Sequence, residues 1–107
     1  YKTGTRVGSG GSEAAAANMC VTGYVTVGSN DTVRIKNVTV SGGSAPYLLL
    51  YGSNGSYLAA MTVPEADANG VICIQPGQWE DNRVQTFRLS VGRIDGSSVI
   101  TINEEIS

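Results

Sequence analysis

The feature that most restricts the fold is the alternation of short strand-favouring runs with turn residues. Runs rich in valine, isoleucine, threonine and tyrosine are separated by glycine-containing turns at intervals of roughly ten residues. Glycine supplies 14 of the 107 residues and charged residues only 15%, as is typical of short strands joined by tight turns. The one helix-like run, residues 14–17, is too short for a stable helix. We therefore predict an all-β chain.

The strongest strand signal is residues 47–51, Tyr-Leu-Leu-Leu-Tyr, which are apolar at every position. This pattern predicts a central strand covered on both faces. Asn54-Gly55 predicts a tight hairpin after it, and Asp95-Gly96 predicts another between the last two strands. The complete set of predicted strands covers residues 20–27, 32–40, 47–51, 57–63, 71–75, 86–93 and 98–106.

The strand over residues 32–40 carries a change of phase. Val33 and Ile35 alternate with Arg34 and Lys36, but the two valines that follow at 38 and 40 fall out of step, which predicts a bulge near Asn37.

The strand spacing predicts one domain, an antiparallel β-sandwich of seven or eight strands with a jelly-roll-like arrangement. Within it, residues 1–19 are predicted to be a loose lead-in with weak strand character near residues 5–7, and residues 20–107 the sandwich itself.

Several classes of function fit the chain poorly. The seven basic residues are dispersed and the formal net charge is −2, so we do not expect nucleic acid as a partner. No apolar run approaches the roughly 20 residues of a membrane helix and no leader is evident, so no membrane insertion is expected. Because the chain begins at Tyr1 rather than methionine, we expect it to be a piece of something longer.

Catalysis is not expected either. The chain has no histidine, which removes the usual base for a serine or cysteine nucleophile. Neighbouring carboxyls such as Glu104 and Glu105 would point to opposite faces of a strand and could not converge on a substrate. We predict a protein that is not an enzyme and has no cofactor. Asp31, Asp67 and Asn69 are interpreted as turn formers rather than ligands of a structural calcium.

Cys20 and Cys73 are the only cysteines. A pair so far apart in an all-β chain could form a disulfide between facing sheets. The alternative is two free thiols that act as small hydrophobic residues. The spacing does not decide between these two states.

The segment with the composition of a ligand site is the predicted loop around Trp79, the only tryptophan. Sugar rings stack on aromatic faces, while carboxylates, amides and guanidinium groups bind their hydroxyls. The alternative is that Trp79 caps the open end of the sandwich above ordinary turn residues. The predicted ligand-binding residues are Trp79, Glu80, Asp81, Asn82, Arg83 and Tyr57.

Three stretches carry a resemblance to a known kind of module. They are YKTGTR at residues 1–6, CVTGYV at residues 20–25 continuing to NDTVRIKN at residues 30–37, and VITINEEI at residues 99–106. Together they resemble a β-sandwich module of tail, baseplate and fibre proteins from bacteriophages and prophages of gut Firmicutes. The two cysteines and a longer loop over residues 75–85 depart from that pattern.

The resemblance implies a terminal accessory domain in a virion or outside the cell, with host cell-surface glycan and other virion subunits as partners. Our leading hypothesis is accordingly a non-catalytic, carbohydrate-binding module of a phage tail. A structural domain for virion decoration or homo-oligomer packing is the second hypothesis. A secreted bacterial adhesion or carbohydrate-binding module is the third.

Overall fold

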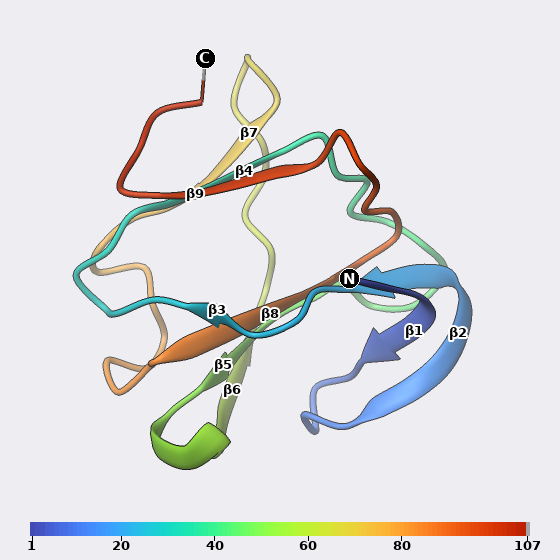
Figure 1. Cartoon of the computed structure of the whole chain (residues 1–107), viewed down its shortest axis with the longest axis horizontal. Helices are drawn as coiled ribbons and strands as arrows, with labels where there is room; N and C mark the ends of the chain where they lie inside the picture. The colour runs from blue at the N-terminus through green and yellow to red at the C-terminus, as the bar shows by residue number, and fades with distance from the viewer. Residues whose placement is uncertain (107) are drawn as a thin grey trace.

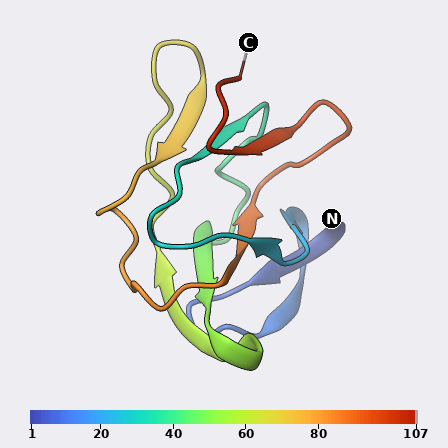
Figure 2. The same ribbon diagram turned by 60° about the vertical axis from the view of Figure 1, so that its left-hand side comes forward.

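Two antiparallel sheets face each other in the computed structural model, which describes residues 1–106 (Figures 1 and 2). The larger sheet has the strand order β1-β2-β8-β5-β6, with the short β3 also paired to β8, and the smaller has the order β7-β4-β9. The predicted all-β sandwich is confirmed. The strands are β1 (Lys2–Val7), β2 (Glu13–Val21), β3 (Val25–Thr26), β4 (Val33–Lys36), β5 (Tyr47–Tyr51), β6 (Tyr57–Met61), β7 (Val71–Ile74), β8 (Thr86–Val91) and β9 (Val99–Ile102).

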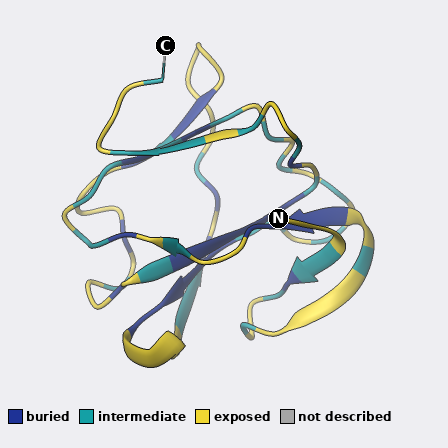
Figure 3. Ribbon diagram, viewed as in Figure 1, coloured by how far each residue is buried: buried dark blue, intermediate teal, exposed yellow. Residues whose placement is uncertain are grey.

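Strand β5 lies inside the larger sheet and is buried on both faces, as its unbroken apolar sequence predicts. Leu48 and Leu50 point into the main core between the two sheets. Leu49 and Tyr51 point the other way, into a second small core with Val7 and Val21. Figure 3 shows β5 and β8 as largely buried strands between these two cores. Burying four such side chains contributes about 1.5–3 kcal/mol each, which makes β5 the centre of the fold.

The second core exists because residues 1–19 form a hairpin rather than a loose lead-in. Strands β1 and β2 pair from Lys2 and Val21 to Val7 and Glu13, and the hairpin curls over the outer face of the larger sheet (Figure 1). The backbone N–H of Val7 donates to the hydroxyl of the buried Ser90 on β8, at 3.0 Å. The run at 14–17 is therefore strand, because pairing with β1 outweighs the weak helix propensity of a few alanines.

The predicted strand over residues 20–27 is interrupted where it passes β8. It is regular to Val21, breaks at residues 22–24 and resumes as β3. At the break, the Thr22 N–H donates to the carbonyl of Leu89 at 3.0 Å, and its hydroxyl accepts the Leu89 N–H at 2.8 Å. The Thr22 hydroxyl thus takes the place of a backbone carbonyl as the acceptor for the Leu89 N–H, and the regular pairing with β8 resumes only at Val25.

The change of phase near Asn37 has a structural cause. Strand β4 ends at Lys36, and Asn37 adopts a left-handed conformation with φ of 60°. Beyond it, Thr39 makes an isolated bridge to Arg93. The turn resets the alternation, so that Val38 and Val40 pack against the main core like Val33 and Ile35 before them.

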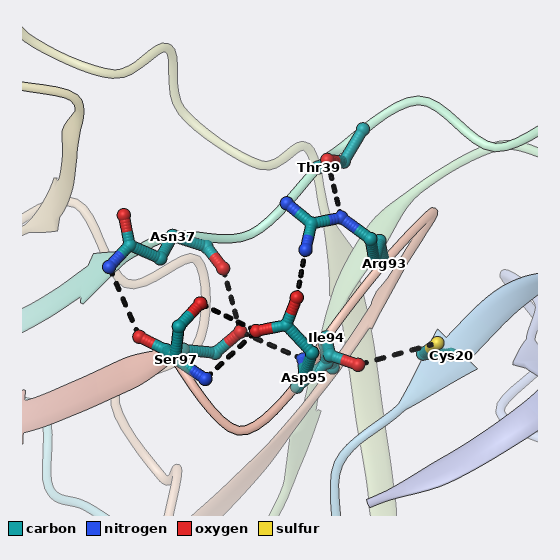
Figure 4. A network of polar contacts seen from close by, with 8 residues as sticks. Cys20, Asn37, Thr39, Arg93, Ile94, Asp95 and Ser97 are labelled. Atoms are coloured by element: carbon teal, nitrogen blue, oxygen red, sulfur yellow. Dashed lines mark hydrogen bonds and ion pairs between the residues drawn. The ribbon is translucent and has the colours of Figure 1, made fainter.

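The predicted hairpin at Asp95-Gly96 is wrong. After β8 the chain crosses to the other sheet, where β9 pairs with β4 and not with β8. Figure 4 shows why the turn is held there: Asp95 accepts hydrogen bonds from Ser97 and pairs with Arg93. The turn is also tied to the chain beyond β4, because the Ser98 hydroxyl donates to the Asn37 carbonyl at 2.7 Å. The contact with Asn37 joins segments 61 residues apart, which a local turn signal does not report.

Two glycines allow that crossing region to pack closely. A Cβ added to Gly92 would overlap the backbone carbonyl of Ser41 and approach Gly42, and one added to Gly42 would overlap the carbonyl of Asn18. In the same place the Gly92 N–H donates to the carbonyl of Val40 at 2.9 Å. Backbone approach of this kind leaves no room for a side chain.

We expect Gly92→Ala to destabilise the domain by about 1–3 kcal/mol or more, because the obstructing atoms are backbone and cannot turn aside. Urea unfolding followed by circular dichroism measures this change. Gly96→Ala is the matched control, since a Cβ there meets nothing within 4 Å and Gly96 does not have a positive φ. Equal stabilities of the two variants would contradict the close packing.

Candidate functional site

Trp79, the residue on which the sequence-based site depended, is buried. Its ring is 7% exposed and packs in the main core, with its centroid 6.1 Å from that of Phe87. The indole N–H donates to the carbonyl of Asp31 at 3.0 Å. Trp79 therefore caps the end of the sandwich, as in the alternative interpretation, and cannot offer a face to a sugar.

The other residues predicted around Trp79 remain at the surface. Glu80 and Asn82 are exposed, and Arg83 is held by a bidentate pair with Asp81, with N–O distances of 3.0 and 2.8 Å. These bonds, together with one from the Arg83 N–H, lower the pKa of Asp81 from 3.8 to about 2. Arg83 also lines a pocket of about 410 Å³ beside the β5–β6 turn. Without an exposed ring, this loop offers polar contacts only.

We expect the Trp79 fluorescence of the folded domain to resist quenching by acrylamide, because the ring is shielded from solvent. Trp79→Ala should lower the free energy of unfolding by about 3–5 kcal/mol. Glu80→Ala, next to it but exposed, should change this quantity by no more than about 0.5 kcal/mol. Strong quenching in the folded state would contradict the buried position.

The Asp81–Arg83 pair makes a pH-dependent contribution to the loop. Since the folded pKa is lowered, the stabilisation is complete above the ordinary aspartate value and is lost as the pH falls from about 4 towards about 2. An NMR titration of the Asp81 carboxyl carbon should give a pKa of about 2. In Arg83→Gln that pKa should return towards its ordinary value of about 3.9. An ordinary value in the wild type would show that the pair does not form in solution.

The two cysteines are free. Cys20 is buried in the core, and its Sγ contacts the carbonyl of Ile94 (Figure 4). Cys73 lies on the smaller sheet opposite Arg34, whose side chain points away from the core. The thiols thus lie in different layers of the sandwich. Of the two states that the sequence left open, a disulfide or two free thiols, the structure has the free thiols.

The residues considered as calcium ligands instead form hydrogen bonds that stabilise turns and loops. The Asp31 carboxylate accepts the Gly28 N–H at 2.7 Å and the Asn103 amide at 2.9 Å, and both bonds lower its pKa. One oxygen of Asp67 accepts the N–H groups of Asn69 and Val71. Within residues 1–106, no three His, Cys, Asp or Glu side chains are grouped as a metal site would require.

An aromatic cluster with two exposed rings, Tyr24 and Tyr57, lies elsewhere, on the outer face of the larger sheet. It consists of Tyr24, Tyr51 and Tyr57 with the charged residues Arg88 and Glu13, and we call it the tyrosine platform. Tyr51 is at its centre, 3% exposed, with its ring centroid 5.0 Å from Tyr24 and 5.8 Å from Tyr57. Burial, and then the neighbouring Tyr24, raise the pKa of Tyr51. The Tyr51 hydroxyl at the centre of the platform is thus uncharged in the physiological pH range.

Arg88 lies beneath the platform and contacts both Tyr24 and Glu13. Its side chain is almost fully buried, and its guanidinium carbon lies 4.9 Å from the centroid of the Tyr24 ring. The guanidinium donates to the Thr22 carbonyl at 2.9 Å and pairs with Glu13 at 2.8 Å. Lys2 approaches the same carboxylate at 3.0 Å, and the two cations lower the pKa of Glu13. Because a buried charge must be paired, these contacts fix Arg88 under Tyr24.

The outer tyrosines differ in how they are held. Tyr57 donates its hydroxyl proton to the Ser9 carbonyl in the β1–β2 turn. Gly11 lies against its ring, where an added Cβ would come 2.7 Å from Cγ. Tyr24 is 58% exposed, although its edge contact with Tyr51 and the cation–π contact with Arg88 fix its orientation. A rigid ring with an open face is suited to stacking on an apolar ligand surface.

Of the residues predicted to bind ligand, only Tyr57 belongs to this platform. Sequence reasoning missed Tyr24, Arg88 and Glu13, which come from three separate segments. One signal was present: Arg88 interrupts the apolar residues of β8, and a charge in a buried strand needs a partner. Its partner, however, is 75 positions away and could not be named.

The chain gives no match to protein-family models, to curated proteins or to solved structures. Among residues 1–106, the structure has no helix of the length and apolar character needed to cross a membrane.

Proposed function

We propose that this domain is a non-catalytic carbohydrate-binding module that recognises glycan through the tyrosine platform. The observation that carries the proposal is Tyr24, whose ring is 58% exposed and yet fixed by Tyr51 and Arg88. A preorganised ring loses little side-chain entropy when a ligand stacks on it, so most of the contact energy is available for affinity.

The charged residues around Arg88, which contacts the Tyr24 ring, supply the polar half of such a site. Glu13 is 36% exposed at its side chain and Lys2 63%. A carboxylate accepts hydrogen bonds from sugar hydroxyls and an ammonium donates to them. An aromatic face next to fixed donors and acceptors is the composition that sugars require, since each pyranose ring has apolar C–H faces and a polar rim.

The absence of histidine from the sequence supports a binding rather than a catalytic role. Two carboxylates are engaged by arginine: Asp81 by Arg83, and Glu105, which was considered for catalysis, by Arg34. The resemblance of three stretches to phage tail modules supports host cell-surface glycan as the ligand and the virion as the location.

We expect Tyr24→Ala to weaken glycan binding at least about tenfold, which corresponds to about 1.4 kcal/mol. A glycan array identifies ligands for the wild type, and calorimetry then measures the affinity of each variant. Tyr1→Ala is the matched control, because Tyr1 is 62% exposed and is not part of the platform. Both variants should keep the wild-type circular dichroism spectrum.

Two results would contradict this site. A folded wild type that binds no glycan would contradict the function itself. A glycan whose binding survives Tyr24→Ala but is lost in Arg83→Ala would move the site to the pocket beside the β5–β6 turn.

A further inference from the structure

The outer face of the smaller sheet contains a pocket of about 590 Å³. Strands β4 and β7 form its floor. Its walls are the turn before β7 and the segment that follows β9, and Figure 1 shows both rising above the sheet. The volume is within the range of small-ligand sites. Since the tyrosine platform is on the outer face of the other sheet, the pocket is a separate surface.

Strand β4 places two cations on this floor. Val33 and Ile35 point into the core, so Arg34 and Lys36 both point outward, about 7 Å apart along the strand. Their cross-strand neighbours are Cys73 and Val71 on β7, and Thr101 and Val99 on β9. No carboxylate therefore lies directly opposite either cation on the adjacent strands.

The two cations differ in how their charge is compensated. Arg34 donates to the Glu104 carbonyl at 2.9 Å and pairs with Glu105 at 3.3 Å. Lys36 makes no ion pair within residues 1–106. Asp67, the other acid of the pocket, holds its own turn by accepting the N–H groups of Asn69 and Val71. Asp67 keeps its charge, but within residues 1–106 Lys36 is the one cation of the pocket that has no ion-pair partner within 4.0 Å.

Amide groups complete the lining. Asn69 and Gln75 both line the pocket, and their side-chain amides make no hydrogen bond with another of the described residues. Each amide can donate and accept, which suits the vicinal hydroxyls of a sugar. Within residues 1–106, the pocket thus combines one ammonium on β4 that makes no ion pair with two unbonded amides, one before β7 and one after it.

We propose that this pocket is a second binding site, specific for an acidic saccharide. Lys36 pairs with the anionic group, and Asn69 and Gln75 bind the hydroxyls. Arg34 stays with Glu105 and keeps the wall of the pocket in place. With one site on each outer face, the domain can hold two glycan chains at once, one neutral or charged on the platform and one acidic in the pocket.

The test is an NMR titration of the ¹⁵N-labelled domain with trigalacturonic acid and, separately, with maltotriose. We expect trigalacturonic acid to shift the amide signals of residues 34–36 and 67–75 and to bind at least about threefold more tightly than maltotriose at this pocket. Lys36→Gln should weaken the binding of trigalacturonic acid about three- to tenfold. Arg6→Gln, which removes a cation of β1 outside the pocket and the platform, should leave it unchanged.

Several outcomes would overturn the second site. These are an absence of shifts at residues 34–36 with trigalacturonic acid, equal affinity for the two probes at the pocket, or an unchanged affinity in Lys36→Gln. Tyr24→Ala separates this inference from the proposed function. If that variant loses binding at the platform and retains the shifts at residues 34–36, the two sites are independent.

Discussion

The burial of β5 on both faces is the constraint on which the rest of the structure depends. A strand of five apolar residues cannot leave either face in water without losing about 1.5–3 kcal/mol for each large side chain. The smaller sheet covers one face, and the β1–β2 hairpin covers the other. The hairpin in turn brings Glu13 over β8, where it neutralises Arg88. The tyrosine platform is therefore a consequence of how the second face of β5 is covered.

The same arrangement separates two kinds of surface. On the larger sheet, the outer face carries aromatic rings above a buried, paired arginine. On the smaller sheet, the outer face carries a pocket lined by polar groups, among them Lys36, which makes no ion pair within residues 1–106. A platform of rings suits the flat apolar side of a sugar, whereas a hollow with an ammonium suits an acidic one. Each proposed site draws on residues from at least three segments, and its central residues, Tyr51 and Arg88 on one face and Lys36 on the other, lie on strands.

The sequence predicted Trp79 as the exposed ring of the site, whereas in the structure Trp79 is buried and Tyr24 is exposed. Trp79 lies in a segment rich in polar residues and Tyr24 lies within the strand predicted over residues 20–27, so the local sequence favours exposing Trp79 rather than Tyr24. The difference arises from their neighbours. Trp79 has Phe87 beside its ring and the carbonyl of Asp31 as an acceptor for its N–H, so it can be buried without losing a hydrogen bond. Tyr24 lies over Arg88 on an outer face and is 58% exposed.

The sequence by itself determined the class of the fold, the central place of residues 47–51, the Asn54-Gly55 hairpin and the alternation of β4. These follow from local rules, because side-chain period and turn chemistry act over a few residues. Only the tertiary structure decided that residues 1–19 cover the sheet, that β9 joins β4, that the thiols are separate and that Tyr24 is the exposed ring. Each of these depends on contacts between segments tens of residues apart. Their free energies appear only when the sheets are packed together.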